Sequence, residues 1–497
     1  MESVQGLLSG FSVALSLTNI LYCFCGCLLG TLVGVLPGLG PAAAIALLFP
    51  TAMHIDPVGA VIMLAGIYYG AQYGGSTTSI LLNIPGEATS VVTCMDGYQM
   101  ARKGRAGAAL GMSAFGSFIA GTIATLGLVF FAPLLANVAL KFGPPEFFSL
   151  TVMCMTMVTY LSRGSFIKGL MMVPLGLILA SVGMDPHTGT FRFAYGTLTL
   201  RDGLGIVPIV MGLFGISEVL LNVGTPVHRT FLKTRIKGLF PTLRDWKASK
   251  WPILRGTLLG FGAGVLPGLG LASTFISYGV EKRVSKHPED FGTGIIEGVA
   301  APEACNNAAS QASFIPMLSL GIPTNVIMAM MLGALMVYGI TPGPLLLKEH
   351  PNLFWGLISS MYIGNCMLLV LNLPLIPLWV QILKIPYSYL FPSILLFCVI
   401  GSYTLNNNIG DVIVMFVFGV VGYLMKRFDF EAAPLVLALI LGPLLEDNLR
   451  QALLISRGSF TVFVTRPISG AFIIVSVAIL VSSILRLRPK VEVEEVT

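Results

Sequence analysis

The sequence has very little charge. Of its 497 residues only 10% are Asp, Glu, Lys or Arg, whereas 55% are hydrophobic and the mean hydropathy is +0.86. Soluble domains carry about 25% charged residues, so this composition excludes a soluble globular protein. Apolar runs, the first of them Phe11–Val33, recur along nearly the whole chain. We therefore expect an all-α polytopic membrane protein with about 10–12 transmembrane segments.

The signatures of an enzyme or of a pump are also missing. The five histidines lie in or beside predicted loops, and neither an HExxH motif nor a GxGD pair occurs. The sequence has no GxxxxGK[ST] phosphate loop and no CxxC pair. We therefore expect no catalysis, no cofactor and no metal beyond a transported Na⁺. An ATPase on a separate chain stays compatible with the sequence.

One stretch occurs twice. Gly34–Gly40 and Gly264–Gly270 share seven consecutive residues, Gly-Val-Leu-Pro-Gly-Leu-Gly. Each copy is followed by a related Ile-Pro segment, Leu82–Glu87 in the first half and Leu320–Asn325 in the second. Chance is a poor explanation for this agreement, so we expect two related membrane repeats.

A basic segment separates the repeats. Residues 228–255 hold eight Lys or Arg against a single acid, Asp245, so the positive-inside rule predicts a cytoplasmic linker. The first repeat then covers residues 1–227 and the second covers residues 256–465. Residues 466–497 are expected to form an extra terminal span and a cytoplasmic tail. Because basic residues lie in short loops, we expect no nucleic-acid partner despite the net charge of +6.

Charge in the loops indicates that the repeats face opposite ways. The loop Pro50–Pro57 has no basic residue, whereas the matching loop Glu281–Asp290 has three. After the Ile-Pro segments the bias reverses, with three basic residues in Arg102–Arg105 against Lys348 alone. This pattern predicts inverted-topology repeats, as in many secondary transporters. The extra span, Ile468–Leu485, reconciles an odd number of crossings per repeat with a cytoplasmic C-terminus.

Each glycine-rich stretch is expected to form the tip of a re-entrant hairpin or a broken helix. Pro37 and Pro267 remove backbone donors, and the neighbouring glycines permit left-handed angles. Exposed N–H groups at the start of the following helix attract anions. Four tip glycines are therefore candidate ligands for a carboxylate: Gly38, Gly40, Gly268 and Gly270. Close helix packing through these glycines is the alternative.

The second element of each repeat is polar although it lies in an apolar region. Hydroxyls and amides are costly inside a membrane unless they are partnered, so a dense cluster of them indicates a binding site. The candidate substrate ligands are Gly74, Gly75, Ser76, Thr77, Thr78, Ser79 and Asn83, then Asn306, Asn307, Ser310, Thr324 and Asn325. A hydrogen bond back to its own helix is the alternative for any single Ser or Thr.

The same segments contain candidates for breaking helices and for coupling an ion. The prolines expected to interrupt helices here are Pro85, Pro302 and Pro323. Side-chain oxygens together with freed carbonyls suit Na⁺, and a carboxylate also suits a proton. The predicted ion-coupling residues are Asn83, Glu303, Asn307 and Gln311. The choice between Na⁺ and H⁺ stays open.

These motifs carry a family resemblance. The duplicated stretch, the segment YGGSTTSILLNIPGE (Tyr73–Glu87) and the segment APEACNNAA (Ala301–Ala309) resemble signatures of the TctA family, the large membrane subunit of tripartite tricarboxylate transporters. The similarity in length and layout covers essentially the whole chain. The resemblance implies a multi-pass permease of the bacterial inner membrane that works with a small four-span membrane subunit and a periplasmic solute-binding protein.

The resemblance also implies the reaction. Such a permease takes up citrate-like tricarboxylates or dicarboxylates by symport with Na⁺ or H⁺. Two other functions stay open from the residues alone: a stand-alone ion-coupled carboxylate transporter and a passive anion channel. The oligomeric state is open as well, a homo-oligomer in the bilayer included.

Overall fold

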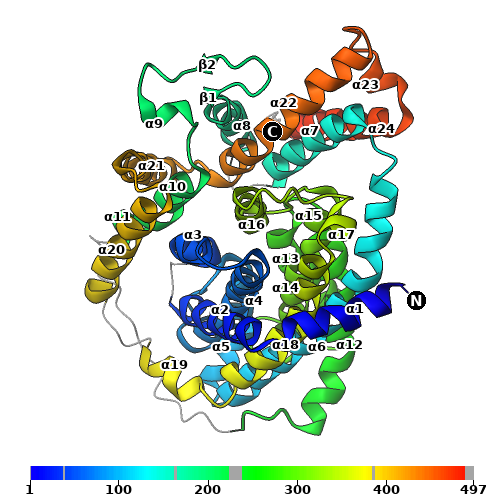
Figure 1. Ribbon diagram of the computed structural model, residues 1–497. Coiled ribbons are helices and arrows are strands. Elements are labelled where there is room, and N and C mark those ends of the chain that lie inside the picture. Colours follow the sequence, from blue (N-terminus) through cyan, green and yellow to red (C-terminus); the bar gives the residue numbers. More distant parts are fainter. Residues whose placement is uncertain (1, 37–39, 162–164, 223–237, 383–386, 487–497) are drawn as a thin grey trace, which may run out of the picture.

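The structure is a computed structural model that describes residues 2–36, 40–161, 165–222, 238–382 and 387–486 (Figure 1). Most of these residues are helical, which confirms the predicted all-α fold. Loops connect the helices, and the described strands form one short antiparallel ladder between β1 (Gly183–Met184) and β2 (Phe191–Arg192).

The helices run in chain order as follows. The first half contains α1 (Glu2–Ala14), α2 (Leu17–Val35), α3 (Gly40–Ala52), α4 (Pro57–Leu82), η1 (Ala88–Ser90), α5 (Val91–Arg102), α6 (Ala106–Ala139), α7 (Pro144–Leu161), α8 (Phe166–Ala180), α9 (Leu198–Arg201), α10 (Ile206–Val210), η2 (Met211–Ile216) and α11 (Ser217–Asn222). The second half contains α12 (Leu243–Val265), α13 (Leu269–Val284), η3 (Pro288–Asp290), α14 (Glu297–Ala312), α15 (Phe314–Leu320), α16 (Val326–Val337), α17 (Leu346–Glu349), α18 (Pro351–Asn372), α19 (Ile376–Ile382), α20 (Tyr387–Asn406), α21 (Ile409–Arg427), α22 (Ala432–Ile455), α23 (Val462–Thr465) and α24 (Pro467–Arg486).

Several of these helices suit a membrane. By length and composition, five are long and apolar enough to cross one: α2, α6, α18, α21 and α22. Six shorter apolar stretches of 10–17 residues accompany them: Gly40–Ala52, Phe166–Ala180, Ile206–Leu221, Val326–Val337, Phe391–Asn406 and Pro467–Ser483. The chain is therefore a multi-pass membrane protein, and the total of about 10–12 spans stays a prediction.

Two predicted elements differ in the structure. The apolar run Phe11–Val33 is divided, because Ser16 caps a new helix by accepting a hydrogen bond from the backbone nitrogen of Asn19 at 3.3 Å. Pro302 does not break a helix but lies within α14. Packing explains this, because α14 is buried along nearly its whole length and tertiary contacts outweigh one missing backbone hydrogen bond.

Part of the predicted linker is helical. Its residues 228–237 lie outside the described residues, and α12 begins at Leu243, well inside the predicted segment. A capping box starts that helix: Asp245 donates its backbone N–H to the Thr242 hydroxyl at 3.2 Å, and the Asp245 carboxylate accepts from the Thr242 backbone at 3.0 Å. The same helix then continues to Val265, directly before the second tip.

Two closely packed helix pairs form the centre of the molecule. In α2, a Cβ built on Gly26, Gly30 or Gly34 would lie 2.3–2.4 Å from a carbonyl oxygen of α4. In α12, a Cβ on Gly256, Gly260 or Gly264 would lie 2.1–2.3 Å from a carbonyl oxygen of α14. Residues four apart share one helix face, so each row of glycines allows the two backbones to touch. We call these contacts the two glycine seams.

Each seam leads directly into a glycine-rich tip. After α12, the chain turns through Gly268, whose φ of +80° is left-handed, and continues as α13. After α2, the chain returns as α3, which begins at Gly40 with a φ of +59°. Pro37, Gly38 and Leu39 lie outside the described residues. Both copies of the duplicated stretch therefore lie between two helices, and in the second copy the described residues form the turn.

The remaining helices surround this centre. Figure 1 shows α20 and α21 on one flank and α7, α22 and α24 on the other, with α4, α14 and α16 between them. Helix α24, at the position predicted for an extra terminal span, packs against α7, where Ser469 and Ser149 hydrogen-bond at 2.7 Å. The outer helices close the space beside the two tips.

Candidate substrate-binding site

A cavity of about 370 Å³ lies between the two helix pairs and the outer helices. Pockets for small organic ligands span about 300–1,000 Å³, so this volume suits a small organic acid. Its inner wall carries the polar side chains of Tyr68, Gln72, Glu87, Thr89, Thr324 and Asn325. Its outer wall is largely apolar and includes Val158, Leu161, Leu213, Phe214 and Leu437.

Glu87 supplies a carboxylate to the inner wall although only 7% of it is exposed. Asn306 on α14 donates its side-chain nitrogen to Glu87 Oε1 at 2.9 Å, and the Thr89 hydroxyl also donates to that oxygen. One terminal atom of the Gln72 amide lies 2.7 Å from Glu87 Oε2 and 2.6 Å from Oε1. With its nitrogen there, Gln72 donates to the carboxylate and its oxygen accepts from Ser310 at 3.2 Å.

The turn after α4 places the Glu87 side chain against that helix. Asn83 ends α4 with a left-handed φ of 58°, and Glu87 then caps the short helix η1. The Ser90 hydroxyl accepts from the Glu87 backbone nitrogen at 3.3 Å and donates to its carbonyl at 2.8 Å. A Cβ on Gly75 would lie 2.6 Å from Glu87 Cγ, so only glycine leaves room for this side chain.

The segment Gly321–Asn325 supplies the facing part of the inner wall. Thr324 is 3% exposed, and its hydroxyl has no hydrogen-bond partner among the described residues. The Thr324 carbonyl accepts from the Gly268 backbone nitrogen at 2.9 Å, which joins this segment to the second tip. Asn325 caps α16 and donates to the Tyr68 hydroxyl at 3.3 Å. The cavity borders this hydroxyl, so a ligand or a water bound there would supply its hydrogen-bond partner.

The second tip opens onto the cavity. Gly268 and Gly270 both line it, and a Cβ on Gly270 would meet no atom within 4 Å. Helix α13 begins at Leu269, so the Gly270 backbone N–H is one of the donors that lack an acceptor within the helix. Such a helix start favours a negatively charged group. In the first tip Gly40 does not line the cavity, but the next residues, Pro41 and Ala42, do.

Glu303 forms a separate network behind the cavity wall. It is 1% exposed and does not lie among the described residues that line the cavity. Its Oε2 accepts from Ser76 at 2.7 Å and from Ser113 at 2.9 Å, and its Oε1 accepts from the Thr93 hydroxyl. These donors come from α4, α6 and α5, so one carboxylate joins three helices to α14.

Several predicted ligands contact protein instead of the cavity. Thr78 donates to the Val35 carbonyl at 2.7 Å, and Ser79 donates to the Ser90 hydroxyl at 2.9 Å. Gly74 belongs to the first glycine seam, since its Cβ would lie 2.3 Å from the Thr31 carbonyl oxygen. These residues therefore hold α4 in place.

The predicted ion-coupling residues do not border the cavity either. Asn83 is exposed at the end of α4, and Asn307 donates to the Ser117 hydroxyl at 2.6 Å. Gln311 is 2% exposed, and its side-chain oxygen has no partner among the described residues, yet it does not border the cavity. Thr77 is buried and does not border it either.

Asn306 and Ser310 lie next to the cavity. Both lie beside Gln72 in a crevice of about 30 Å³ that shares six residues with the cavity: Tyr68, Gln72, Thr89, Gly270, Thr324 and Asn325. Tyr68 and Thr89 line the cavity as well, although the sequence does not single them out. Tyr68 lies within an apolar run and Thr89 lies after the Ile-Pro segment, so neither position stands out by composition.

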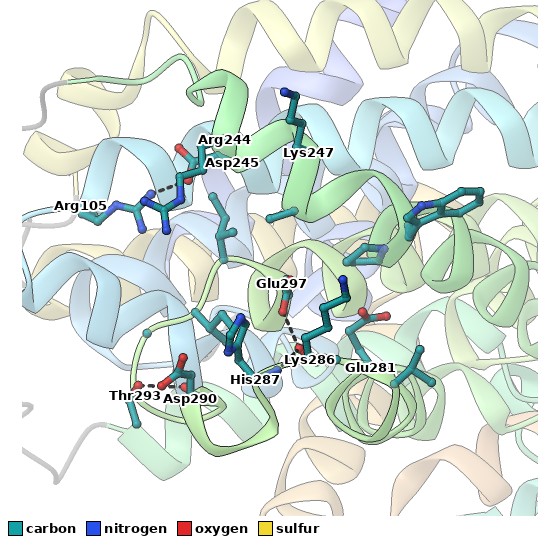
Figure 2. A pocket seen from close by; sticks show the side chains of 18 of the residues that line it. Arg105, Arg244, Asp245, Lys247, Glu281, Lys286, His287, Asp290, Thr293 and Glu297 are labelled. Atoms are coloured by element: carbon teal, nitrogen blue, oxygen red, sulfur yellow. Dashed lines mark hydrogen bonds and ion pairs between the residues drawn. The ribbon is translucent and has the colours of Figure 1, made fainter.

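A second cleft, of about 960 Å³, collects basic residues (Figure 2). They come from three segments: Lys103 and Arg105 from the connection of α5 to α6, Arg244, Lys247 and Arg255 from α12, and Lys286 from the connection of α13 to α14. Arg105 pairs with Asp245 at 2.6 Å, and Arg255 pairs with Glu281 at 2.6 Å. The positive-inside rule favours one cytoplasmic side for all three basic segments, and the structure brings them together.

Apolar helices that enclose a cavity with polar side chains on one wall are typical of membrane transport proteins. The comparison with protein families identifies the kind of transport protein. Residues 20–437 match the tripartite tricarboxylate transporter TctA family, and the chain belongs to that family. The resemblance drawn from the duplicated stretch is therefore confirmed.

Two relatives come from Agrobacterium vitis. The chain is 51% identical over 500 residues to an uncharacterized 52.8 kDa protein in the TAR-I ttuC′ 3′ region, and the match covers 100% of both chains. It is 52% identical over 245 residues to an uncharacterized protein in the TAR-II ttuC′ 3′ region, which covers 48% of this chain and 100% of that protein. No solved structure matches the chain.

Proposed function

We propose that this chain is the large permease subunit of a tripartite secondary transporter in the bacterial inner membrane. It takes up a tricarboxylate or a related dicarboxylate by symport with Na⁺ or H⁺. A periplasmic binding protein delivers the acid, and a small four-span membrane subunit completes the complex. Membership of the TctA family supports the assembly with other components.

One observation carries the choice of an organic acid. The 370 Å³ cavity combines the start of α13 at Gly270, the unpartnered Thr324 hydroxyl and the amide of Asn325. Backbone N–H groups, hydroxyls and amides are the donors that a carboxylate prefers when no Arg or Lys is used. The apolar outer wall suits the carbon skeleton of the acid.

The two repeats are proposed to have inverted topology. The meeting of three basic segments in one cleft supports a shared cytoplasmic side for Arg105, Arg255 and Lys286, as loop charge predicts. On this basis the tips enter the membrane from opposite faces as re-entrant hairpins, and the substrate binds between them near the midplane. The tips and the segments after α4 and α15 then move against a static remainder.

Uptake by proteoliposomes tests this function. The chain is reconstituted with its four-span subunit, the binding protein is added outside, and ¹⁴C-citrate and ¹⁴C-succinate serve as probes. An inward Na⁺ or H⁺ gradient is imposed in separate arms. We expect accumulation of at least one acid above equilibrium in one arm. Equilibration that ignores both gradients would instead favour a passive channel, and full activity without the partners would favour a stand-alone transporter.

A further inference from the structure

We infer that Glu87, rather than Glu303, is the carboxylate through which the driving cation is coupled to the organic acid. This inference rests on the proposed function, because it assigns the cation site within the same cavity. Glu87 was not among the ion-coupling residues predicted from the sequence.

The position of Glu87 provides the first argument. It borders the cavity together with Thr324 and Gly270, so a bound organic acid and the Glu87 carboxylate share one small space. Two negative charges in such a space repel strongly, because the surroundings screen them poorly. The acid therefore binds well only when Glu87 carries a proton or a cation. Each ligand then favours the other, and that reciprocal coupling is what symport requires.

The charges around Glu87 provide the second argument. Of the described basic residues, only Lys426 borders the cavity, and it forms an ion pair with Glu218. Glu87 itself forms no ion pair with any described residue; its described partners, on α4, η1 and α14, are neutral. The other titratable groups nearby are Tyr68 and Glu431 on the cavity wall and Glu303 behind it. A buried carboxylate without a fixed countercharge is free to take up a mobile one.

The Gln72 amide provides the third argument. Its terminal atom lies 2.6 and 2.7 Å from the two Glu87 oxygens. An amide nitrogen at that position satisfies the ionised carboxylate. An amide oxygen there requires a proton on Glu87 or a cation between the oxygens, because two acceptors cannot bond directly. Rotation of one amide therefore lets the same site hold Glu87 both with and without its cation.

Glu303 lacks these properties. Its three hydroxyl donors, Ser76, Thr93 and Ser113, all lie within the helix bundle, and it is separate from the cavity. A substrate would not meet its charge directly. Glu303→Gln is therefore a matched control, since it neutralises an equally buried carboxylate outside the cavity.

The experiment compares wild type, Glu87→Gln and Glu303→Gln in the co-reconstituted complex, with ¹⁴C-citrate and ¹⁴C-succinate as probes. Two readouts are measured for each: accumulation driven by an inward Na⁺ or H⁺ gradient, and exchange of external labelled acid for internal unlabelled acid without a gradient. We expect Glu87→Gln to lose at least tenfold in accumulation and to retain exchange within about threefold. Glu303→Gln is expected to retain gradient-driven accumulation. The gradient, Na⁺ or H⁺, that drives accumulation by wild type identifies the cation.

Three outcomes would overturn the inference. They are Glu87→Gln accumulating the acid as wild type does, Glu303→Gln losing accumulation while exchange persists, and folded Glu87→Gln losing exchange together with accumulation. The third would make Glu87 a substrate ligand only. If neither gradient drives accumulation by wild type, the proposed function itself is wrong, and this result is distinct from the three above.

A second variant covers the case in which Glu87→Gln does not fold. Glu87→Asp keeps the charge and moves it away from Gln72. We expect it to accumulate the acid but to need a severalfold higher cation concentration for half-maximal rate. An unchanged cation requirement in Glu87→Asp would contradict the assignment.

Discussion

Ser76 on α4 donates a hydrogen bond of 2.7 Å to Glu303 on α14, although the two residues are 227 positions apart in the chain. Each belongs to a different half of the protein, so this bond connects the two central helix pairs. Neither residue borders the cavity, and their contact explains why polar side chains occur deep within apolar helices. The structure thus separates polar residues that hold the halves together from polar residues that face the cavity.

Removing the Glu303 carboxylate is expected to destabilise the protein. Glu303→Ala leaves three buried hydroxyls without their acceptor, which costs on the order of 3 kcal/mol or more in the free energy of unfolding. Thermal melting of the purified protein in detergent checks this. Thr125→Ala is the control, because the Thr125 hydroxyl donates to the Gly121 carbonyl of its own helix, at 2.8 Å. Equal melting temperatures for the two variants would contradict the role of Glu303.

Adding a side chain in the second glycine seam is expected to destabilise the protein. A Cβ on Gly260 would lie 2.1 Å from the Cys305 carbonyl oxygen, so Gly260→Ala forces α12 and α14 apart. We expect a loss of about 1–3 kcal/mol in the free energy of unfolding. Gly262→Ala on the same helix is the control, since its Cβ would meet nothing within 4 Å and alanine favours the helix. Equal effects on the melting temperature would mean that close packing is not the reason for glycine here.

A substitution at Thr324 is expected to impair transport without lowering stability. Thr324→Val removes a buried hydroxyl that has no described partner, so the melting temperature should stay the same or rise. The KM for the organic acid should increase about tenfold, which corresponds to about 1.4 kcal/mol of binding. Thr257→Val is the control, because that hydroxyl bonds to the Ile253 carbonyl within α12 at 2.7 Å. A KM for Thr324→Val equal to that of wild type would remove Thr324 from the site.

Acid is expected to weaken the contact that holds the β1–β2 hairpin. Hydrogen bonds from Arg192 and Arg450 hold the pKa of Asp185 well below its ordinary value. A depressed folded-state pKa stabilises the fold at pH values above the unfolded-state pKa, and this stability is lost as the pH falls through the folded-state value. Wild type should therefore melt above Asp185→Asn at pH 7, and the difference should shrink only below about pH 4. Asp447→Asn, at an exposed residue that contacts His187, should show a smaller difference.

The sequence predicted the helical membrane fold and the duplicated tips, because composition and a repeated glycine-rich stretch are local signals. Gly268, Gly270, Thr324 and Asn325 were predicted as ligands, and they do border the cavity. The other candidates shared the same composition, and only the direction of each side chain distinguishes them. Ser76 points toward Glu303 in the other half of the chain, a contact that the sequence cannot predict.

The importance of Glu87 was hidden for the same reason. It follows a proline and a glycine, where a loop residue is usually exposed, and Gly75 makes its burial possible by leaving space on α4. A glycine on one element that accommodates a side chain of another has no signature in a single sequence. The sequence suggested close helix packing only as an alternative role for the tip glycines, whereas the seams involve glycines one to three turns before each tip.

The central claim is that the cavity beside the second tip holds the transported acid. The most direct measurement is gradient-driven accumulation of ¹⁴C-citrate and ¹⁴C-succinate by proteoliposomes containing wild type, Gly270→Leu or Gly262→Leu. Gly270 opens onto the cavity and Gly262 onto the outer surface of α12, and neither Cβ would meet an atom within 4 Å. We predict that Gly270→Leu folds but loses accumulation at least tenfold, while Gly262→Leu transports as wild type does. Equal accumulation by the two variants would contradict the account.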